Sequence, residues 1–100
     1  MLDWHLYLVR CHDGSLYTGI TNNVACRFAE HQENNGAGAK YLRGRGPLVL
    51  VFQKKLLSRS LALRVESKVK KLSKARKEEL RRADTLIDEI IKQVSSQFTV

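Results

Sequence analysis

The dipeptide Asp13-Gly14 places a tight turn early in the chain and so constrains the topology around it. Glycine accepts the positive φ angle that tight hairpin turns require, and Asp-Gly between two strand-forming runs is a strong short-range hairpin signal. The flanking runs, residues 6–9 and 15–18, are rich in strand formers. We therefore predict a β-hairpin with strands over residues 5–11 and 15–20. Its pairing brings two tyrosines, Tyr7 and Tyr17, near each other.

The remaining elements follow from apolar spacing and capping residues. Residues 21–23 supply N-cap chemistry for a helix from Val24 to Glu33, and an exposed loop over residues 34–47 follows it. The apolar run from Leu48 to Phe52 is typical of a central strand that is buried on both faces. Three further helices are expected. The first spans residues 60–72 with Ser58 or Ser60 as its cap, the second starts at Ser73 and runs to residue 83, and the third begins at residue 84. The order β-β-α-β-α-α-α predicts one α+β domain, residues 1–100, on a small and mostly antiparallel sheet.

Composition excludes several classes of protein. A length of 100 residues with 43% hydrophobic content suits one compact domain with a modest core. No apolar run approaches the roughly 20 residues that a membrane helix needs, and the N-terminus lacks the features of a secretory signal. Cys11 and Cys26 have no metal-type spacing, so we interpret them as reduced and buried thiols. We therefore expect an intracellular, cytoplasmic protein without membrane contact.

The formal net charge of +8 is unevenly distributed. Residues 40–82 hold fifteen of the 18 lysines and arginines but only three of the 10 acids. Such a basic segment attracts polyanions, nucleic acid first, although a merely solvated helical surface has the same composition. The candidate nucleic-acid-binding residues in this segment are Lys40, Arg43, Arg45, Lys68 and Lys71.

Two residues of the first predicted helix can join the tyrosines of the hairpin. Arg27 and His31 are four residues apart and share one helix face, and this helix begins shortly after the hairpin. Tyr7, Tyr17, Arg27 and His31 therefore form a candidate catalytic set, although each taken singly is an ordinary strand or helix-surface residue. A phenol near a cation can act as a base, an arginine can bind phosphate oxygens, and a histidine can orient water. Phosphodiester cleavage needs these functions together.

Glu66 is the fifth candidate, at the flank of the apolar stripe of the 60–72 helix. Two interpretations are open. The first is a helix-surface ion pair with Lys70 one turn later or with nearby Arg59, which contributes little to stability. The second is a hard oxygen ligand for a divalent cation, Mg²⁺ or Mn²⁺. The sequence pattern alone favours the ion pair.

In order and spacing, these residues resemble a GIY-YIG nuclease domain of the small single-domain type, over residues 4–83. Tyr17-Thr18-Gly19 resembles the second family motif, whereas His5-Leu6-Tyr7 keeps only the tyrosine of the first. The family's later functional positions are matched by Arg27, His31 and Glu66. Residues 38–44 resemble a loop of the stand-alone members.

The resemblance implies a three-stranded antiparallel sheet flanked by helices. It also implies hydrolysis of DNA phosphodiester bonds through one metal ion held by Glu66, and we assign the base to Tyr17 and the positioning of water or phosphate to Tyr7. A separate DNA-targeting domain is absent from the sequence, so we expect weak, salt-dependent binding, structure-selective cleavage or recruitment by a targeting protein partner. A role in DNA repair or recombination is consistent with the resemblance. The choice between DNA and RNA, the preferred metal and the oligomeric state stay open.

Two other functions compete with this hypothesis. A non-catalytic nucleic-acid-binding module that keeps the fold would use the basic run over residues 68–82. A protein-interaction domain would use the apolar stripe of the last helix, provided that this stripe is not packed within the domain itself. That stripe comprises Leu86, Ile87, Ile90, Ile91 and Val94.

Overall fold

The computed structural model describes residues 3–33 and 47–96. Its elements are, in chain order, β1 (Trp4–Arg10), β2 (Leu16–Thr21), α1 (Val24–Glu33), β3 (Val49–Leu56), α2 (Arg59–Lys70), α3 (Lys74–Arg82) and α4 (Asp84–Ser96). The three strands form one antiparallel sheet in the order β2-β1-β3. The predicted α+β class and element order are confirmed. Three of the predicted binding residues, Lys40, Arg43 and Arg45, lie outside the described residues.

The predicted hairpin turn forms at Gly14, which has a φ of 86°. The Gly14 amide donates to the carbonyl of Cys11 at 2.9 Å, and the Cys11 amide donates to the carbonyl of Ser15 at 2.9 Å. The side chain of Arg10 donates to Gly14 O at 3.1 Å and to both carboxylate oxygens of Glu78 at 2.8 and 2.6 Å. This bidentate pair lowers the pKa of Glu78 through its hydrogen bonds to Arg10. It ties the turn to α3, a contact that the sequence did not predict.

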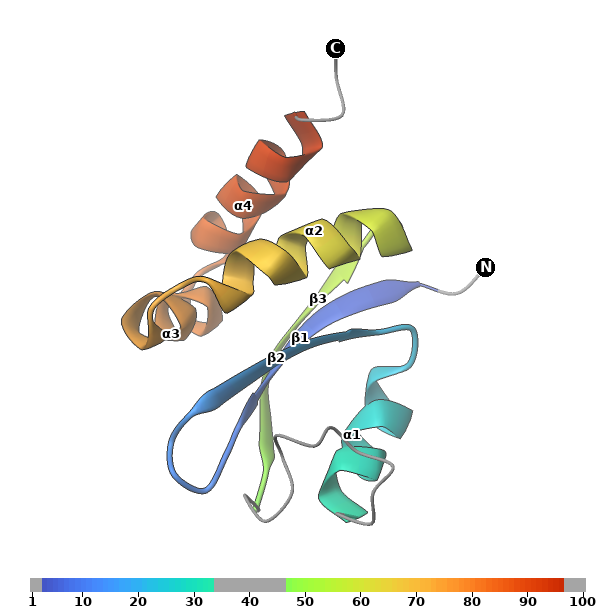
Figure 1. Cartoon of the computed structure of the whole chain (residues 1–100), viewed down its shortest axis with the longest axis vertical. Helices are drawn as coiled ribbons and strands as arrows, with labels where there is room; N and C mark the ends of the chain where they lie inside the picture. The colour runs from blue at the N-terminus through green and yellow to red at the C-terminus, as the bar shows by residue number, and fades with distance from the viewer. Residues whose placement is uncertain (1–2, 34–46, 97–100) are drawn as a thin grey trace.

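Side chains of β1 alternate between two hydrophobic clusters on opposite faces of the sheet. Leu6 and Leu8 belong to the large cluster, which contains buried residues of α2, α3 and α4. Tyr7 and Val9 belong to the small cluster, against which Phe28 of α1 packs. Accordingly, α1 lies on one side of the sheet and the other three helices lie on the opposite side (Figure 1). The candidate tyrosines therefore belong to the face that α1 covers.

The structure corrects the prediction for the apolar run 48–52. β3 is an edge strand and β1 is the central strand; Val49 of β3 is 54% exposed. A register shift between β1 and β3 leaves Val51 as the extra residue, so that Leu50 packs in the small cluster whereas Val51 and Phe52 pack against the large one. Apolar clusters on both faces of the sheet therefore contact this edge strand, which explains its continuous apolar run, and residues 50–52 are only partly buried. Such a pattern cannot distinguish an edge strand from a central one.

Three helices begin at side-chain caps, as their sequences predict. Asn23, Ser58 and Ser73 each accept a backbone N–H from three residues ahead, at 3.0, 3.1 and 3.3 Å. The prediction for the thiols is half wrong, because Cys11 is buried but Cys26 is exposed on α1.

The apolar stripe of α4 is part of the large cluster, since Ile87, Ile90 and Val94 are at most 5% exposed. The condition for the protein-interaction hypothesis is therefore not met, and that hypothesis is wrong in the form stated. Within the described part of the chain, no helix combines the length and apolar character needed to cross a membrane.

Candidate functional site

Three aromatic rings from three elements meet on the α1 face of the sheet. In the β1–β2 register, Tyr7 lies opposite Gly19 and Val9 lies opposite Tyr17, so the two tyrosines are diagonal neighbours on one face. Their ring centroids are 6.4 Å apart. The ring of His31, carried by α1, lies 5.9 Å from Tyr7 and 5.6 Å from Tyr17. The hairpin and the returning helix thus bring together three of the four predicted catalytic residues.

Gly19 makes this arrangement sterically feasible. The Tyr7 ring lies directly over Gly19, and a Cβ added at Gly19 would overlap the Tyr7 hydroxyl and approach Cε1 to 2.9 Å. Glycine within a strand often marks a place where another group approaches the backbone closely. The glycine of Tyr17-Thr18-Gly19 therefore provides the space that the Tyr7 ring occupies.

Tyr7 is held in its neutral form. Its side chain is 2% exposed, and its hydroxyl forms a 2.9 Å hydrogen bond with His31 Nε2. Burial, and then the neighbouring Tyr17, raise the pKa of Tyr7 to about 12, although Arg27 acts in the opposite direction. Tyr7 is therefore a protonated phenol at neutral pH. Tyr17 is only half-buried, so it is the more accessible of the two phenols.

His31 is also neutral. It is 1% exposed, and burial, followed by the positive charge of Arg27, lowers its pKa below the usual 6.5. Protonating this imidazole would leave a second cation beside Arg27 in a buried position. His31 therefore acts as a neutral hydrogen-bonding partner that orients Tyr7.

The lowered pKa of His31 predicts a pH dependence of folding stability. As pH falls below about 6.5, the unfolded chain binds a proton at this histidine before the folded chain does, so the free energy of unfolding decreases. Above that pH the histidine is neutral in both states and contributes no slope. We expect urea unfolding to show that the free energy of unfolding falls more steeply between about pH 7.5 and 5.5 in the wild type than in His31→Gln. Equal slopes in the two proteins, which share His5 and His12, would contradict the assignment.

Arg27 stays cationic beside the tyrosines. Burial opposes its charge, but interactions with Tyr7 and then with Glu30 outweigh burial and raise the pKa of Arg27. Arg27 Nη1 lies 3.5 Å from Glu30 Oε1, and the Arg27 side chain is 32% exposed. A partly exposed guanidinium beside a phenol is suited to binding a phosphate oxygen.

Glu66 approaches the same region from α2. Its carboxylate forms an ion pair with Lys70, with 3.6 Å between Oε2 and Nζ, and its side chain is 17% exposed. The ion pair that the sequence pattern favours is therefore present. The same carboxylate is among the smaller causes that raise the pKa of Tyr7, so its charge acts on the aromatic cluster. The charge of Glu66 thus reaches Tyr7, although α2 packs on the face of the sheet opposite α1.

The available donors fit one kind of divalent cation. Among the described residues, no group of three or more His, Cys, Asp or Glu side chains is arranged to hold a metal. This donor set does not suit a resident zinc or calcium ion, which needs several protein ligands. Mg²⁺ instead keeps several waters and takes one or two carboxylates together with substrate phosphates. Glu66 alone satisfies that requirement, so the residues present fit Mg²⁺ or the similar Mn²⁺.

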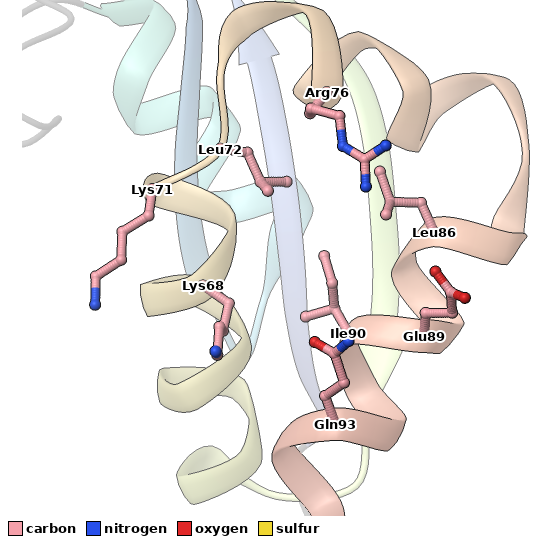
Figure 2. A pocket seen from close by; sticks show the side chains of 8 residues that line it. All are labelled: Lys68, Lys71, Leu72, Arg76, Leu86, Glu89, Ile90 and Gln93. Atoms are coloured by element: carbon pink, nitrogen blue, oxygen red, sulfur yellow. The ribbon is translucent and has the colours of Figure 1, made fainter.

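The predicted basic residues at the end of α2 and at its C-cap lie elsewhere. Lys68 and Lys71 line a groove of about 320 Å³ between α2, α3 and α4, whose apolar part is formed by Leu72, Leu86 and Ile90 (Figure 2). The lysines next to Tyr17 are instead Lys70 and Lys77, which line a separate pocket with it. The nucleic-acid role of Lys68 and Lys71 stays a prediction.

Lys70 and Lys77 were not among the site residues predicted from the sequence. Lys70 carried a signal, because it stands one helical turn after Glu66 and therefore on the same face of α2. No sequence signal pointed to Lys77, since only the packing of α3 against the rest of the domain brings this residue to β2.

Comparisons with known proteins show to which family the chain is similar. Residues 3–79 match the family described as the GIY-YIG catalytic domain. The chain is 58% identical over 80 residues to a UPF0213 protein of Cronobacter sakazakii, covering 80% of this chain and 82% of that one. It is 52% identical over 80 residues to the UPF0213 protein YhbQ of Salmonella typhimurium, covering 80% and 78%.

Two solution NMR structures are also similar. The protein EF2693 from E. faecalis has a TM-score of 0.60 and 32% identity, covering 84% of this chain and 88% of that one. The UPF0213 protein BH0048 from Bacillus halodurans has a TM-score of 0.50 and 44% identity, covering 78% and 81%. None of these names states an activity.

Proposed function

The chain belongs to the GIY-YIG catalytic-domain family, and from that premise we propose that it is a metal-dependent endonuclease that hydrolyses phosphodiester bonds of DNA. The observation that carries the proposal is the convergence of Tyr7, Tyr17 and His31, with centroids 5.6 to 6.4 Å apart, beside the cation Arg27 and the carboxylate Glu66. Membership of a nuclease family supports the reaction class. The basic surface of α2 and α3 supports a polyanionic substrate.

Each residue has a distinct part in the proposed reaction. Tyr17, the more accessible phenol, loses its own proton to solvent and then, as the phenolate, accepts the proton of the attacking water. Tyr7, kept neutral and oriented by His31, donates a hydrogen bond to the water or the phosphate. Arg27 binds a non-bridging phosphate oxygen and stabilises the charge that develops in the transition state. Glu66 would hold Mg²⁺ or Mn²⁺, which when bound supplies positive charge to the phosphate and the leaving oxygen.

Nicking of supercoiled plasmid tests this function. The wild-type protein is expected to nick with Mg²⁺ or Mn²⁺ and not with EDTA. Because Glu66 is the proposed ligand, Glu66→Gln should raise the metal concentration needed for half-maximal rate by at least about tenfold. Glu79→Gln, which removes an exposed carboxylate of α3, serves as the charge-matched control and should behave like the wild type.

Two results would count against the proposal. Equal nicking by all three proteins in EDTA would identify the activity as a contaminant. An unchanged metal requirement in Glu66→Gln would remove Glu66 from the role of ligand.

A second candidate function is a non-catalytic nucleic-acid-binding module. The observation that favours it is the 3.6 Å ion pair between Glu66 and Lys70, which engages the proposed metal ligand. Fluorescence titration with duplex, branched and single-stranded DNA, and with RNA, separates the two functions. Binding at moderate salt without cleavage under any divalent metal would favour the module.

A further inference from the structure

A second pocket lies next to Tyr17. It has a volume of about 280 Å³ and is lined by Leu16, Tyr17, Thr18, Lys70 and Lys77. β2 forms one wall, and the other wall comes from the end of α2 and the first turn of α3. This volume is below the roughly 300 to 1,000 Å³ of typical small-molecule sites, so it suits a small group rather than a whole cofactor.

The charges in this pocket are not balanced. Lys70 and Lys77 are close enough that Lys70, after burial, is the second cause that lowers the pKa of Lys77. Lys70 is paired with Glu66, whereas Lys77 forms no ion pair with any of the described acidic residues. The two lysines that line the pocket, with one of them paired to a carboxylate, leave a net positive charge there. A half-buried, unpaired lysine of this kind is stabilised by an anion.

A polar group of β2 in the same pocket also lacks a partner. Thr18 is 3% exposed, and its hydroxyl oxygen is buried without a hydrogen-bond partner in the described structure. Buried hydroxyls are nearly always hydrogen-bonded, so an unsatisfied one requires an explanation. A rotation of this side chain about χ1 changes the direction of its O–H group, which makes it a donor to a ligand that enters the pocket.

We propose that this pocket binds a backbone phosphate of the nucleic-acid strand, next to the phosphate that is cut beside Tyr17. The inference rests on the proposed function and extends it, because it identifies a contact to a phosphate that does not react. Lys70 and Lys77 supply the charge, Thr18 supplies a hydroxyl donor, and Leu16 supplies an apolar wall for the adjoining sugar. Phosphates recur about every 3.4 Å of helix axis along one strand, so a strand with one phosphate at Tyr17 necessarily has neighbours beside it. Contacts of this kind fix the position and register of a strand without reading its sequence.

The test is binding of a labelled DNA strand, measured by fluorescence anisotropy in EDTA so that no cleavage occurs. The full chain is compared with Lys77→Gln and with Lys92→Gln, which removes an exposed lysine of α4 as a charge-matched control. Lys77→Gln is expected to weaken binding about fivefold near 0.1 M salt and to reduce the slope of log K against log salt by about 0.7, whereas Lys92→Gln changes neither.

Neutral methylphosphonate linkages, introduced one at a time along the strand, locate the contact. In the wild type, one position is expected to lose affinity, and in Lys77→Gln this loss of affinity should be smaller because one of the partners of that phosphate is already missing. Thr18→Val, which keeps the charge and the approximate shape of the side chain, should reduce the loss at the same position. The scan is repeated with an RNA strand of the same sequence. A loss of affinity that depends on Lys77, in either strand, supports the pocket.

Two outcomes overturn the inference. In the first, Lys77→Gln binds the strand in the same way as Lys92→Gln. In the second, each methylphosphonate reduces affinity equally in the wild type and in Lys77→Gln. The outcome is independent of cleavage. A Lys77-dependent contact in a protein that nicks no DNA would contradict the proposed nuclease and support the pocket. Nicking by a wild-type protein whose binding does not depend on Lys77 would support the proposed nuclease and contradict the pocket.

Discussion

Tyr17→Phe is expected to slow plasmid nicking by about 10²- to 10⁴-fold, the usual contribution of a general base. The substitution removes one hydroxyl from a half-buried ring and leaves the contacts of that ring with Tyr7 and His31 in place. The free energy of unfolding should therefore change by less than about 0.5 kcal/mol, as for most substitutions outside the core. Initial nicking rates at saturating metal, together with urea unfolding, measure both quantities.

Tyr7→Phe is the matched control for this prediction. Its hydroxyl is bonded to His31 Nε2, and its pKa of about 12 keeps it protonated at neutral pH, so it is not suited to accept a proton. We expect Tyr7→Phe to retain more activity than Tyr17→Phe but to lose stability, because His31 loses a buried partner at a cost of about 1 to 3 kcal/mol. A larger loss of rate in Tyr7→Phe would assign the base to Tyr7 instead.

Gly19→Ala is expected to damage both the fold and the site. The added methyl group would overlap the Tyr7 hydroxyl and part of the Tyr7 ring. Tyr7 cannot move freely, since it is 2% exposed and hydrogen-bonded to His31. Overpacking of this kind costs about 1 to 3 kcal/mol. A shift of about 1 Å in a catalytic group can reduce a rate by about 10²-fold, so we expect nicking to fall by that order.

The double variant Gly19→Ala/Tyr7→Phe distinguishes this steric mechanism from a general loss of strand stability. The Tyr7 hydroxyl is the nearest atom to the added methyl group, so its removal relieves part of the overlap. The stability costs of the two substitutions should therefore be less than additive in urea unfolding. Fully additive costs would show that Gly19 does not act through Tyr7.

Some features of the fold could be predicted from the sequence and others could not, for a physical reason. The hairpin at Gly14 and the caps at Asn23, Ser58 and Ser73 were predictable because each depends on residues within a few positions. The edge position of β3 was not, because helices on both faces of the sheet give an edge strand the apolar run of a central one.

The candidate site also has a part that the sequence predicts and a part that it does not. Tyr7 and Tyr17 are joined by one tight turn, and α1 returns at once to bring His31 to them. The alternatives for Glu66 could not be resolved from helical spacing, which predicts its pairing with Lys70 but not its distance from a strand. Its effect on Tyr7 depends on how α2 crosses the sheet.

The sequence by itself determined the turn, the caps, the α+β class and the pairing of the two tyrosines, because short-range hydrogen bonds and backbone preferences control these features. Only the tertiary structure decided that β1 is the central strand, that Arg10 joins Glu78, and that Lys77 lies beside Tyr17. These contacts join segments that are tens of residues apart. They depend on which apolar faces pack together, and local sequence does not encode the relative orientation of those faces.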